Sequence, residues 1–337
     1  MKIIEILPEL DVGGVERHVI DLANTLAERG HSVTVISYGG RMMCQLSDKV
    51  DHRKLPVHKK NIVTGYLCAR KIAKWVKEEG FELIHAHSRV PAWIAMWVAS
   101  MAKIPFIVTA HVDFGTKTKC IYKPYRKANK TICVSSAVQE GMKKCFYDNT
   151  QVVLNGLDNP KVHWQKPEGE TIKFLFVGRL SKIKGLHDAL RALPQDSNWT
   201  LDVLGDGPIR SELEAEVKEL NIENKVTFHG FSNEADKFMA TSSCLLFPSY
   251  TEGMPLTLAR AVQIGLPVLA SDIPSVSEMA RKHDGLLPPG DIEAWKKAIG
   301  DYIKTGVIPV SIPLESVPTL DKMVDEDEKI YKEILGK

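Results

Sequence analysis

Short apolar segments alternate with longer amphipathic segments along most of the chain. In the first half, five apolar runs have the length and the β-branched content of strands: residues 2–8, 32–38, 83–87, 106–111 and 131–135. Helical periodicity lies between them, as in residues 16–29, where Val19, Leu22 and Leu26 share one face and Gly30 stands at the expected C-terminal cap. This alternation predicts a parallel, doubly wound α/β sheet.

The same alternation starts a second time after a break. Turn-forming residues cluster at residues 155–160, and a polar stretch continues to Thr171. Further strands are predicted at residues 173–179, 201–205, 226–230, 244–248 and 267–271. We therefore expect two Rossmann-like domains, residues 1–158 and 159–318. The last segment, residues 319–337, predicts an amphipathic helix with Met323, Ile330, Tyr331 and Ile334 on one stripe.

Composition and charge add three limits. The chain has 337 residues, which fits two domains, and 44% hydrophobic with 26% charged residues is typical of globular proteins. Residues 1–155 hold 23 Lys and Arg against 14 Asp and Glu, a net of +9, whereas the whole chain carries +2. The asymmetry indicates an anionic partner for the first half, although a chance distribution of surface charge also explains it.

The longest apolar runs are too short to span a bilayer, and the N-terminus lacks a signal-peptide core. The six cysteines are scattered, as in reduced cytoplasmic proteins.

The most informative segment runs from Pro248 to Asp272 and reads PSYTEGMPLTLARAVQIGLPVLASD. A strand-like run ends in a turn that carries Glu252 and Gly253, and a helix of small residues follows. A carboxylate beside the free N–H groups of a helix start can hold a hydroxyl-rich group next to an anionic group.

Two glycine-containing turns follow strands elsewhere. Arg179 ends a strand and Lys184 lies in the next loop, so both cations can converge on one diphosphate; the alternative is a solvated basic loop. Gly13 and Gly14 follow the first strand and let the backbone approach a ligand closely, although a tight turn alone would also need them. The chain has neither the dinucleotide pattern G-x-G-x-x-G nor the P-loop pattern at this turn.

Three histidines lie at predicted strand ends. His85 and His87 are two residues apart and face the same side, but a metal site needs a third ligand, and no convincingly spaced one is apparent. Satisfied polar side chains at the sheet edge are the alternative. His111 ends the next strand, and ligands gather at the carboxyl ends of strands in open α/β sheets.

A basic segment in the first half predicts a contact with anionic lipid. Positions 119, 123, 126/127 and 130 would share a helical face, and each cation near such a surface is worth about 1 kcal/mol. A solvated face is the alternative, and the rest of the chain gives no support for nucleic acid. The cations are Lys117, Lys119, Lys123, Arg126, Lys127 and Lys130, with Tyr122 and Tyr125 between them.

Together, the Gly-Gly turn, the Gly178-Arg179 and Lys184-Gly185 pairs and the segment 248–272 resemble the donor site of family 4 glycosyltransferases. The resemblance covers nearly the whole chain. It implies the GT-B fold, in which two Rossmann-like domains face a cleft and a C-terminal helix crosses back to the N-terminal domain. The N-terminal domain would bind the acceptor and the C-terminal domain the nucleotide sugar. It also implies retaining transfer of a hexose-type sugar from a nucleotide-diphosphate sugar to a hydroxyl acceptor, without a metal or other cofactor.

The resemblance assigns roles to individual residues. Arg179 and Lys184 would stabilise the charge of the leaving diphosphate, and His111 and Glu252 would contact the donor sugar. The remaining donor-binding positions would be Gly13, Gly14, Phe231 near the nucleobase, Gly253, Met254, Pro255, Leu256 and Arg260.

Position 260 departs from the family pattern. The family has a second Glu there, eight residues after the first, which binds ribose hydroxyls, and an arginine cannot accept hydrogen bonds. Arg260 could instead donate to the ribose or contact a phosphate. We expect a cytoplasmic enzyme, at the inner face of the membrane, that builds cell-envelope polysaccharide, lipopolysaccharide or glycolipid on a carbohydrate or lipid-linked acceptor. The alternatives are a non-catalytic nucleotide-sugar binder and another enzyme of this fold, such as a sugar-nucleotide epimerase.

Overall fold

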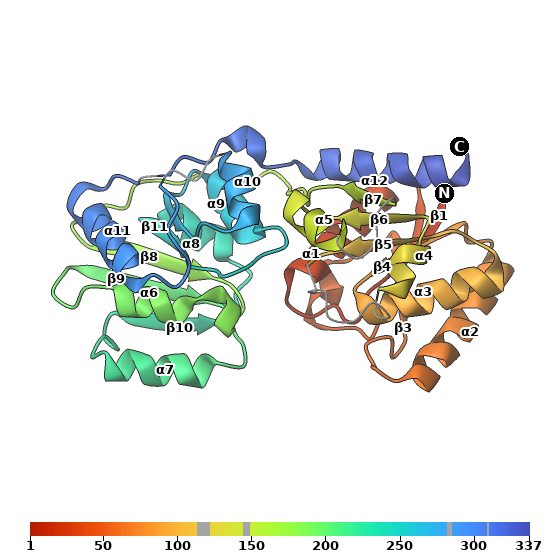
Figure 1. Cartoon of the computed structure of the whole chain (residues 1–337), viewed down its shortest axis with the longest axis horizontal. Coiled ribbons are helices and arrows are strands. Elements are labelled where there is room, and N and C mark those ends of the chain that lie inside the picture. The colour runs from red at the N-terminus through yellow and green to blue at the C-terminus, as the bar shows by residue number, and fades with distance from the viewer. Residues whose placement is uncertain (113–121, 144–148, 282–284, 309) are drawn as a thin grey trace. The chain divides into compact units, whose positions relative to one another are not determined.

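A computed structural model describes residues 1–112, 122–143, 149–281, 285–308 and 310–337. The chain divides into two compact units (Figure 1). The N-terminal unit consists of Met1–Gly156 together with Pro318–Lys337, and the C-terminal unit is Leu157–Val317.

The N-terminal unit is built on a seven-stranded parallel sheet in the order β3-β2-β1-β4-β5-β6-β7. β1 lies inside this sheet, where Ile4 pairs with Thr34 of β2 on one side and with Ile84 of β4 on the other. The strands are β1 Lys2–Ile6, β2 Ser32–Ser37, β3 Val50–Lys54, β4 Leu83–His87, β5 Phe106–Ala110, β6 Lys130–Cys133 and β7 Thr150–Val152.

Amphipathic helices cover this sheet. The apolar faces of α1 and α12 meet in one cluster, in which Val19 and Leu22 pack near Met323 and Tyr331. Asn61 and Thr319 cap α2 and α12, because their side chains accept the N–H of Thr64 and Lys322. The helices are α1 Gly14–Glu28, α2 Ile62–Glu79, α3 Arg89–Ala102, α4 Lys123–Lys127, α5 Ser136–Lys143 and α12 Leu320–Leu335, with a 3-10 turn at Arg41–Gln45.

The C-terminal unit has a five-stranded parallel sheet in the order β10-β9-β8-β11-β12. Successive residues of β8 face opposite sides: Phe174 and Phe176 enter one apolar cluster and Leu175 enters the other. The sheet is therefore buried on both faces. Its strands are β8 Ile172–Val177, β9 Trp199–Leu204, β10 Val226–Gly230, β11 Cys244–Phe247 and β12 Val268–Ala270.

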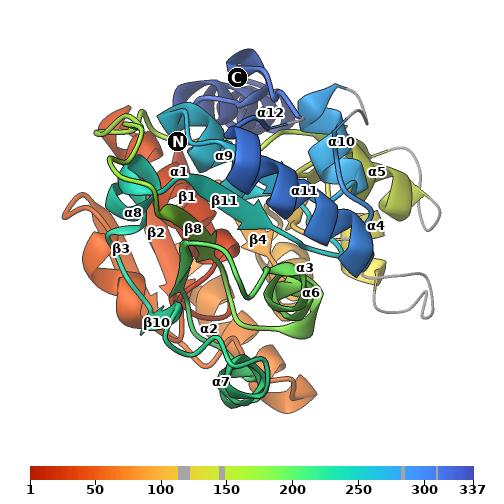
Figure 2. The same cartoon turned by 90° about the vertical axis from the view of Figure 1, so that its left-hand side faces the viewer.

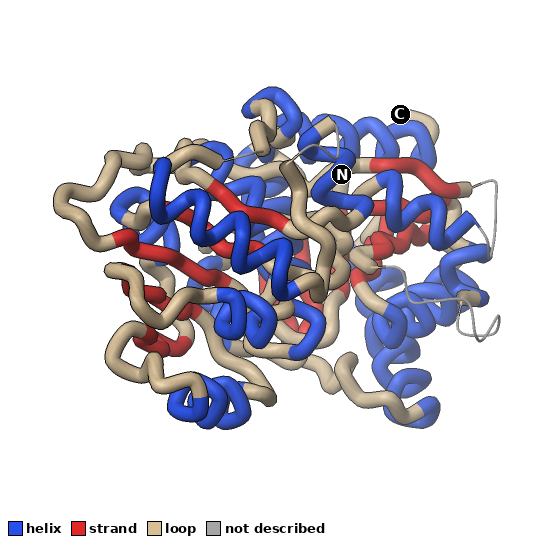
Figure 3. The backbone as a smooth tube through the Cα atoms, turned by 60° about the vertical axis from the view of Figure 1, so that its left-hand side comes forward, coloured by secondary structure: helices blue, strands red, loops and turns tan. Residues whose placement is uncertain are grey.

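Helices flank both sheets, as the tube in Figure 3 shows with helices in blue and strands in red. In the C-terminal unit, α6 and α11 pack side by side (Figure 2). The helices here are α6 Leu186–Ala192, α7 Arg210–Glu219, α8 Ala235–Thr241, α9 Leu256–Ile264, α10 Pro274–Ala280 and α11 Ile292–Thr305, with 3-10 turns at Lys182–Lys184 and Leu314–Ser316.

The strand order places a switch point in each sheet. It lies between β1 and β4 in the N-terminal unit and between β8 and β11 in the C-terminal unit, because the chain winds outward in opposite directions from these pairs. Ligands of doubly wound sheets bind beside such points, at the carboxyl ends of the strands. The prediction of two doubly wound α/β domains is confirmed, and none of the described helices is long and apolar enough to cross a bilayer.

Candidate active site

Glycines hold the loops at the switch point of the C-terminal unit together. A Cβ on Gly185, whose φ is +67°, would lie 2.0 Å from the carbonyl oxygen of Pro248. A Cβ on Gly205, at φ +139°, would lie 1.9 Å from the carbonyl oxygen of Gly178. Any larger residue would push these backbones apart. The glycines therefore fix the loop after β8 against the loops after β9 and β11.

Lys184 and Glu252 meet across these loops. Lys184 Nζ donates to Glu252 Oε1 at 2.6 Å, and Ser249 Oγ donates to the same oxygen at 2.8 Å. The Glu252 side chain is only 12% exposed. Among the described residues, none hydrogen-bonds the second oxygen, Oε2. This oxygen is available to accept a hydrogen bond from a hydroxyl group.

Arg179 lies two residues beyond Val177, the last residue of β8, and is exposed. It makes no hydrogen bond or ion pair with any part of the chain that the structure describes. Lys184 lies close by, because its Cδ is 4.0 Å from the position of a Cβ on Gly178, the residue before Arg179. The structure therefore brings one unpaired guanidinium and one ammonium group to the same strand end. Two such cations suit an anionic group with several oxygens.

The predicted helix start beside Glu252 is present. Gly253, Met254 and Pro255 are buried, and α9 begins at Leu256. Pro255 is the N-cap, and its side chain makes no capping hydrogen bond. The N–H groups of the first turn are thus not used by a side-chain cap.

Arg260 is held by carboxylates. Its Nη1 donates to the backbone oxygen of Asp158 at 2.8 Å, and its Nη2 pairs with the Asp158 carboxylate. Nε lies 3.6 Å from Oδ1 of Asp236. The guanidinium thus links α9 to α8 and to the start of the C-terminal unit. A contact between Arg260 and a nucleotide stays a prediction.

Phe231 follows β10, where the register with β9 shifts between Phe228 and Gly230. Its side chain is 36% exposed. An exposed ring at a strand end can stack on a nucleobase, and that role also stays a prediction.

The glycine turn of the N-terminal unit is exposed. Gly13 has extended backbone, and a Cβ there would lie 2.3 Å from Oε2 of Glu16, so the Glu16 side chain folds back over the turn. Gly14 opens α1. Gly40 packs closely against the residue before this turn, because a Cβ on Gly40 would lie 2.3 Å from the carbonyl oxygen of Leu10.

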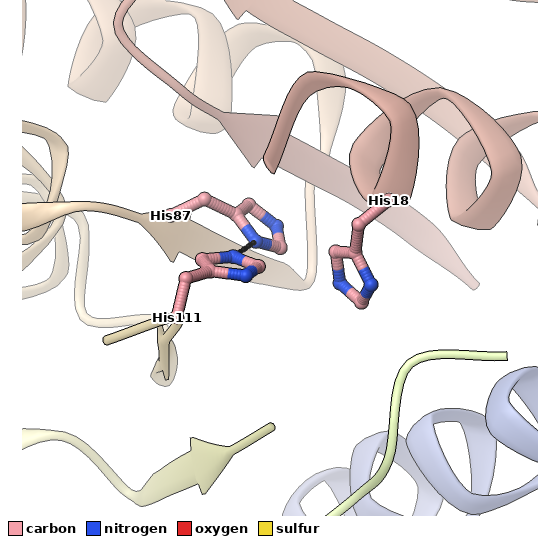
Figure 4. A group of neighbouring side chains, drawn as sticks. All are labelled: His18, His87 and His111. Atoms are coloured by element: carbon pink, nitrogen blue, oxygen red, sulfur yellow. Dashed lines mark hydrogen bonds between the residues drawn. The ribbon is translucent and has the colours of Figure 1, made fainter. Parts of the chain in front are cut away.

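His111 is the end of a hydrogen-bonded series that begins at Glu5. Glu5 Oε2 lies 2.8 Å from His87 Nε2. His87 Nδ1 lies 3.1 Å from His111 Nε2, the contact that Figure 4 marks with a dashed line. Burial, together with nearby histidine charge, lowers the pKa of His87 and of His111 well below the ordinary value, so both rings are neutral. A carboxylate only accepts hydrogen bonds, so His87 donates from Nε2 and accepts at Nδ1. His111 then donates from Nε2 and is left with an acceptor at Nδ1.

His85 lies on the other side of Glu5. Burial disfavours its charged form, but the Glu5 carboxylate outweighs this effect and raises the pKa of His85 above its ordinary value. His85 Nδ1 lies 2.7 Å from the hydroxyl of Tyr331 on α12, which donates in turn to Glu5 Oε1 at 3.2 Å. His85 Nε2 lies 2.7 Å from Thr109 Oγ1. The terminal helix thus takes part in fixing Glu5.

Sequence reasoning missed Glu5 and His18. His18 comes from α1, and its ring stands edge-on to His111 with centroids 5.0 Å apart. Burial lowers the pKa of His18 to about 4. Neither ring nitrogen makes a hydrogen bond of ordinary geometry to the described residues. A carboxylate in an apolar strand was the available signal for Glu5; His18 gave none, because the site is assembled from distant segments.

The structure brings together three side chains that could ligate a metal, including a third ligand that the sequence did not reveal. One nitrogen each of His18, His87 and His111 lies within 4.8 Å of the others, and ligand atoms of Glu5, His85 and His87 form a second such group. Zinc bound at about 2.0–2.1 Å would have to replace the hydrogen bond between His87 and His111. The absence of a metal from the reaction stays a prediction.

The predicted basic helical face is wrong in its extent. α4 covers only Lys123–Lys127, and Lys130 begins β6, because strand pairing with β5 takes over there. Lys123, Arg126 and Lys127 are exposed, while Tyr122 and Tyr125 are buried. Lys117 and Lys119 lie outside the described residues. A contact of these cations with lipid stays a prediction.

Both halves of the chain match glycosyltransferase family models. The family model described as Glycosyltransferase Family 4 matches residues 12–159, and the model described as Glycosyl transferases group 1 matches residues 158–309. An uncharacterized glycosyltransferase of Haemophilus influenzae is 28% identical over 347 residues and covers 96% of both chains. The lipopolysaccharide 1,6-galactosyltransferase of Escherichia coli K12 is 27% identical over 261 residues, 72% of each chain.

Solved structures share the fold. A glycosyltransferase from Rickettsia africae superimposes with a TM-score of 0.82 at 22% identity, covering 99% of this chain and 98% of that one. Anabaena HepE, solved in complex with UDP and glucose, superimposes with a TM-score of 0.78 at 18% identity, covering 99% and 95%.

Proposed function

Since this chain belongs to family 4 of the glycosyltransferases and has the GT-B fold, we propose that it is a retaining enzyme that uses a nucleotide-diphosphate sugar. The observation that carries the proposal is the Lys184–Glu252 ion pair at the switch point of the C-terminal unit, near Arg179, which makes no hydrogen bond or ion pair with the described residues. The N-terminal unit would bind a hydroxyl acceptor, and the C-terminal unit the donor.

The two cations act on the leaving group. In the transition state negative charge grows on the diphosphate as its bond to the anomeric carbon breaks. Arg179 can hold two phosphate oxygens at once, whereas Lys184 supplies a point charge. These groups take the part that a bound metal has in other transferases, so the proposed reaction needs none.

Glu252 and His111 position the sugar. Glu252 Oε2 is the free acceptor for a sugar hydroxyl, while Oε1 keeps Lys184 and Ser249 in place. His111 Nδ1 is a second acceptor at the switch point of the other unit. The first-turn N–H groups of α9 face the same turn as Glu252 and suit a phosphate or hydroxyl oxygen.

The reaction is a substitution with retained configuration. The acceptor oxygen attacks the anomeric carbon on the face from which the diphosphate leaves. The carbon–oxygen bond to the diphosphate breaks, and the acceptor proton passes to the departing phosphate oxygen. No side chain is required as a covalent nucleophile.

The relatives suggest the substrate class. HepE has been solved with UDP and glucose, and the E. coli relative transfers galactose in lipopolysaccharide. UDP-hexoses are therefore the first donors to test, and a cell-envelope glycan or glycolipid is the proposed product. The acceptor would be a carbohydrate or a lipid-linked saccharide.

The test is release of nucleotide from UDP-, GDP- and ADP-sugars, with and without EDTA, together with thermal shifts for each donor. We expect one donor class to stabilise the protein, to release its nucleoside diphosphate when an acceptor glycan is supplied, and to do so with EDTA present. Stabilisation without release under all acceptors would favour a non-catalytic binder. An isomerised sugar nucleotide formed without acceptor would favour an epimerase.

A further inference from the structure

The first two turns of α2 expose four large apolar side chains. Ile62 is 78% exposed, Val63 67%, Tyr66 49% and Leu67 57%. Their spacing of one, three and four residues places them on neighbouring positions of one helical face. A contiguous apolar group of this kind on a protein surface marks an interaction site more often than scattered single residues do.

The opposite face of α2 is buried, so the exposed face is held in place. The buried residues on this face include Gly65, Cys68 and Ile72. A Cβ on Gly65 would lie 3.2 Å from the Trp97 ring of α3, and the Tyr66 ring stands edge-on to Trp97 at 6.1 Å. The apolar side chains are thus presented on a packed helix.

Cations surround the apolar group. Lys59 and Lys60 precede the helix, and Arg70, Lys71 and Lys74 follow along the same side, all exposed. The exposed acid nearest to them in α2, Glu78, is 3.6 Å from Lys74 Nζ. The face as a whole is therefore apolar at its start and positive around it.

We propose that this face of α2 docks on an anionic lipid bilayer. Ile62, Val63 and Leu67 enter the boundary between headgroups and acyl chains, where Tyr66 also has its preferred environment. The lysines and Arg70 lie at headgroup level and gain from the negative surface potential. The inference deepens the proposed function, because it brings the acceptor-binding unit to a lipid-linked acceptor.

A second copy of the chain fits this face less well. A symmetric dimer would place the same patch on both partners, so the cations of one copy would face those of the other. Like charges in such an interface oppose association. An anionic bilayer accepts the apolar and the positive parts together.

The test is co-sedimentation of the full chain with vesicles of phosphatidylcholine alone and of phosphatidylcholine with phosphatidylglycerol. We expect binding to the anionic vesicles that falls with added salt. The double variant Ile62→Ser/Leu67→Ser should lower the partition coefficient about tenfold or more. Lys71→Glu/Lys74→Glu should lower binding and reduce its salt dependence.

The matched control is Val307→Ser/Leu314→Ser, which removes two apolar side chains of the C-terminal unit that are 67% and 59% exposed. It should bind as wild type does. Thermal unfolding and sedimentation velocity of each variant report folding and association. Equal binding by the α2 and control variants, equal binding to neutral vesicles, or a concentration-dependent dimer that the α2 variant abolishes would overturn the proposal. Because co-sedimentation needs no turnover, loss of the proposed transferase activity would leave this result unchanged.

Discussion

Lys184 Nζ lies 2.6 Å from Glu252 Oε1, although 68 residues separate them in the chain. The pair joins the loop after β8 to the loop after β11, and Gly185 makes the approach possible because a Cβ there would strike Pro248. The ammonium group is therefore positioned before any diphosphate arrives. Such preorganisation is what electrostatic stabilisation of a leaving group requires.

Arg179→Ala and Lys184→Ala are each expected to weaken nucleoside diphosphate binding about 10- to 100-fold, since a hydrogen bond to a charged group is worth roughly 1.5–3 kcal/mol. The transfer rate should fall further, because charge grows on the diphosphate in the transition state. Calorimetry and initial rates measure both effects. Lys182→Ala is the control, because this cation of the same loop is 76% exposed. Unchanged affinity in both site variants would remove the diphosphate assignment.

Arg260→Ala should lower the melting temperature by roughly 2–4 °C, because it removes the guanidinium contacts to Asp158 and Asp236, at a cost of about 1 kcal/mol. Arg260→Glu should lower it more, since three carboxylates would then meet. Calorimetry with nucleoside diphosphate, well below the transition, then tests the ribose or phosphate contact. Affinity that falls in Arg260→Ala supports that contact, and wild-type affinity confines Arg260 to a structural role.

His111 should be protonated on Nε2 and free at Nδ1, because Glu5 fixes His87 and His87 fixes His111. Two-bond ¹H–¹⁵N spectra of histidine-labelled protein read the tautomer directly, with His111→Gln to assign the signal. Glu5→Leu should abolish the single tautomer, and Glu5→Gln should retain it through the amide oxygen. Thr109 hydrogen-bonds His85 in this network, so Thr109→Val should leave the tautomer of His111 unchanged. A protonated Nδ1 in the wild type would contradict the assignment.

The Asp327 carboxyl of α12 should make stability depend on pH. Burial raises its pKa to about 7, and both of its oxygens lack a hydrogen-bond partner among the described residues. The folded state thus binds this proton more tightly than the unfolded state, whose pKa is about 3.9. Stability contributed by this group is present below about pH 4 and is lost as the pH rises to about 7.

Asp327→Asn cannot ionise, so its melting temperature should exceed that of the wild type by roughly 10 °C at pH 8 and by only about 2–4 °C at pH 4.5. Differential scanning calorimetry at the two values gives the comparison. The exposed Glu333→Gln on the same helix should show no difference between them. A variant no more stable than wild type at pH 8 would contradict the raised pKa.

Strong local patterns predicted most of the fold. β4 at Leu83–His87 has the predicted bounds, and α12 at Leu320–Leu335 lies within the predicted segment 319–337, because a fully buried strand and a capped amphipathic helix carry their signals in their own residues. β3, which reads Val-Asp-His-Arg-Lys, was missed since an edge strand buries little and shows no apolar run. β7 was missed because it has only three residues.

In the candidate site, too, residues within local motifs could be predicted from the sequence, whereas contacts between distant segments could not. Arg179, Lys184 and Glu252 lie in motifs, so local sequence was enough to name them as candidates. The support of His111 comes from Glu5 on β1, His87 on β4 and Tyr331 on α12. No local pattern contains such contacts, because the strand order and the return of the last helix create them.

That return has a consequence for synthesis. The segment Pro318–Lys337 belongs to the unit that begins at Met1, and Tyr331 reaches the buried Glu5. On the ribosome, Glu5 must wait for Tyr331, which is translated 326 residues later, before the N-terminal unit is complete. The C-terminal unit is a continuous stretch and can finish folding earlier. A stop codon that removes α12 would therefore leave the N-terminal unit incomplete, although the C-terminal unit could still fold.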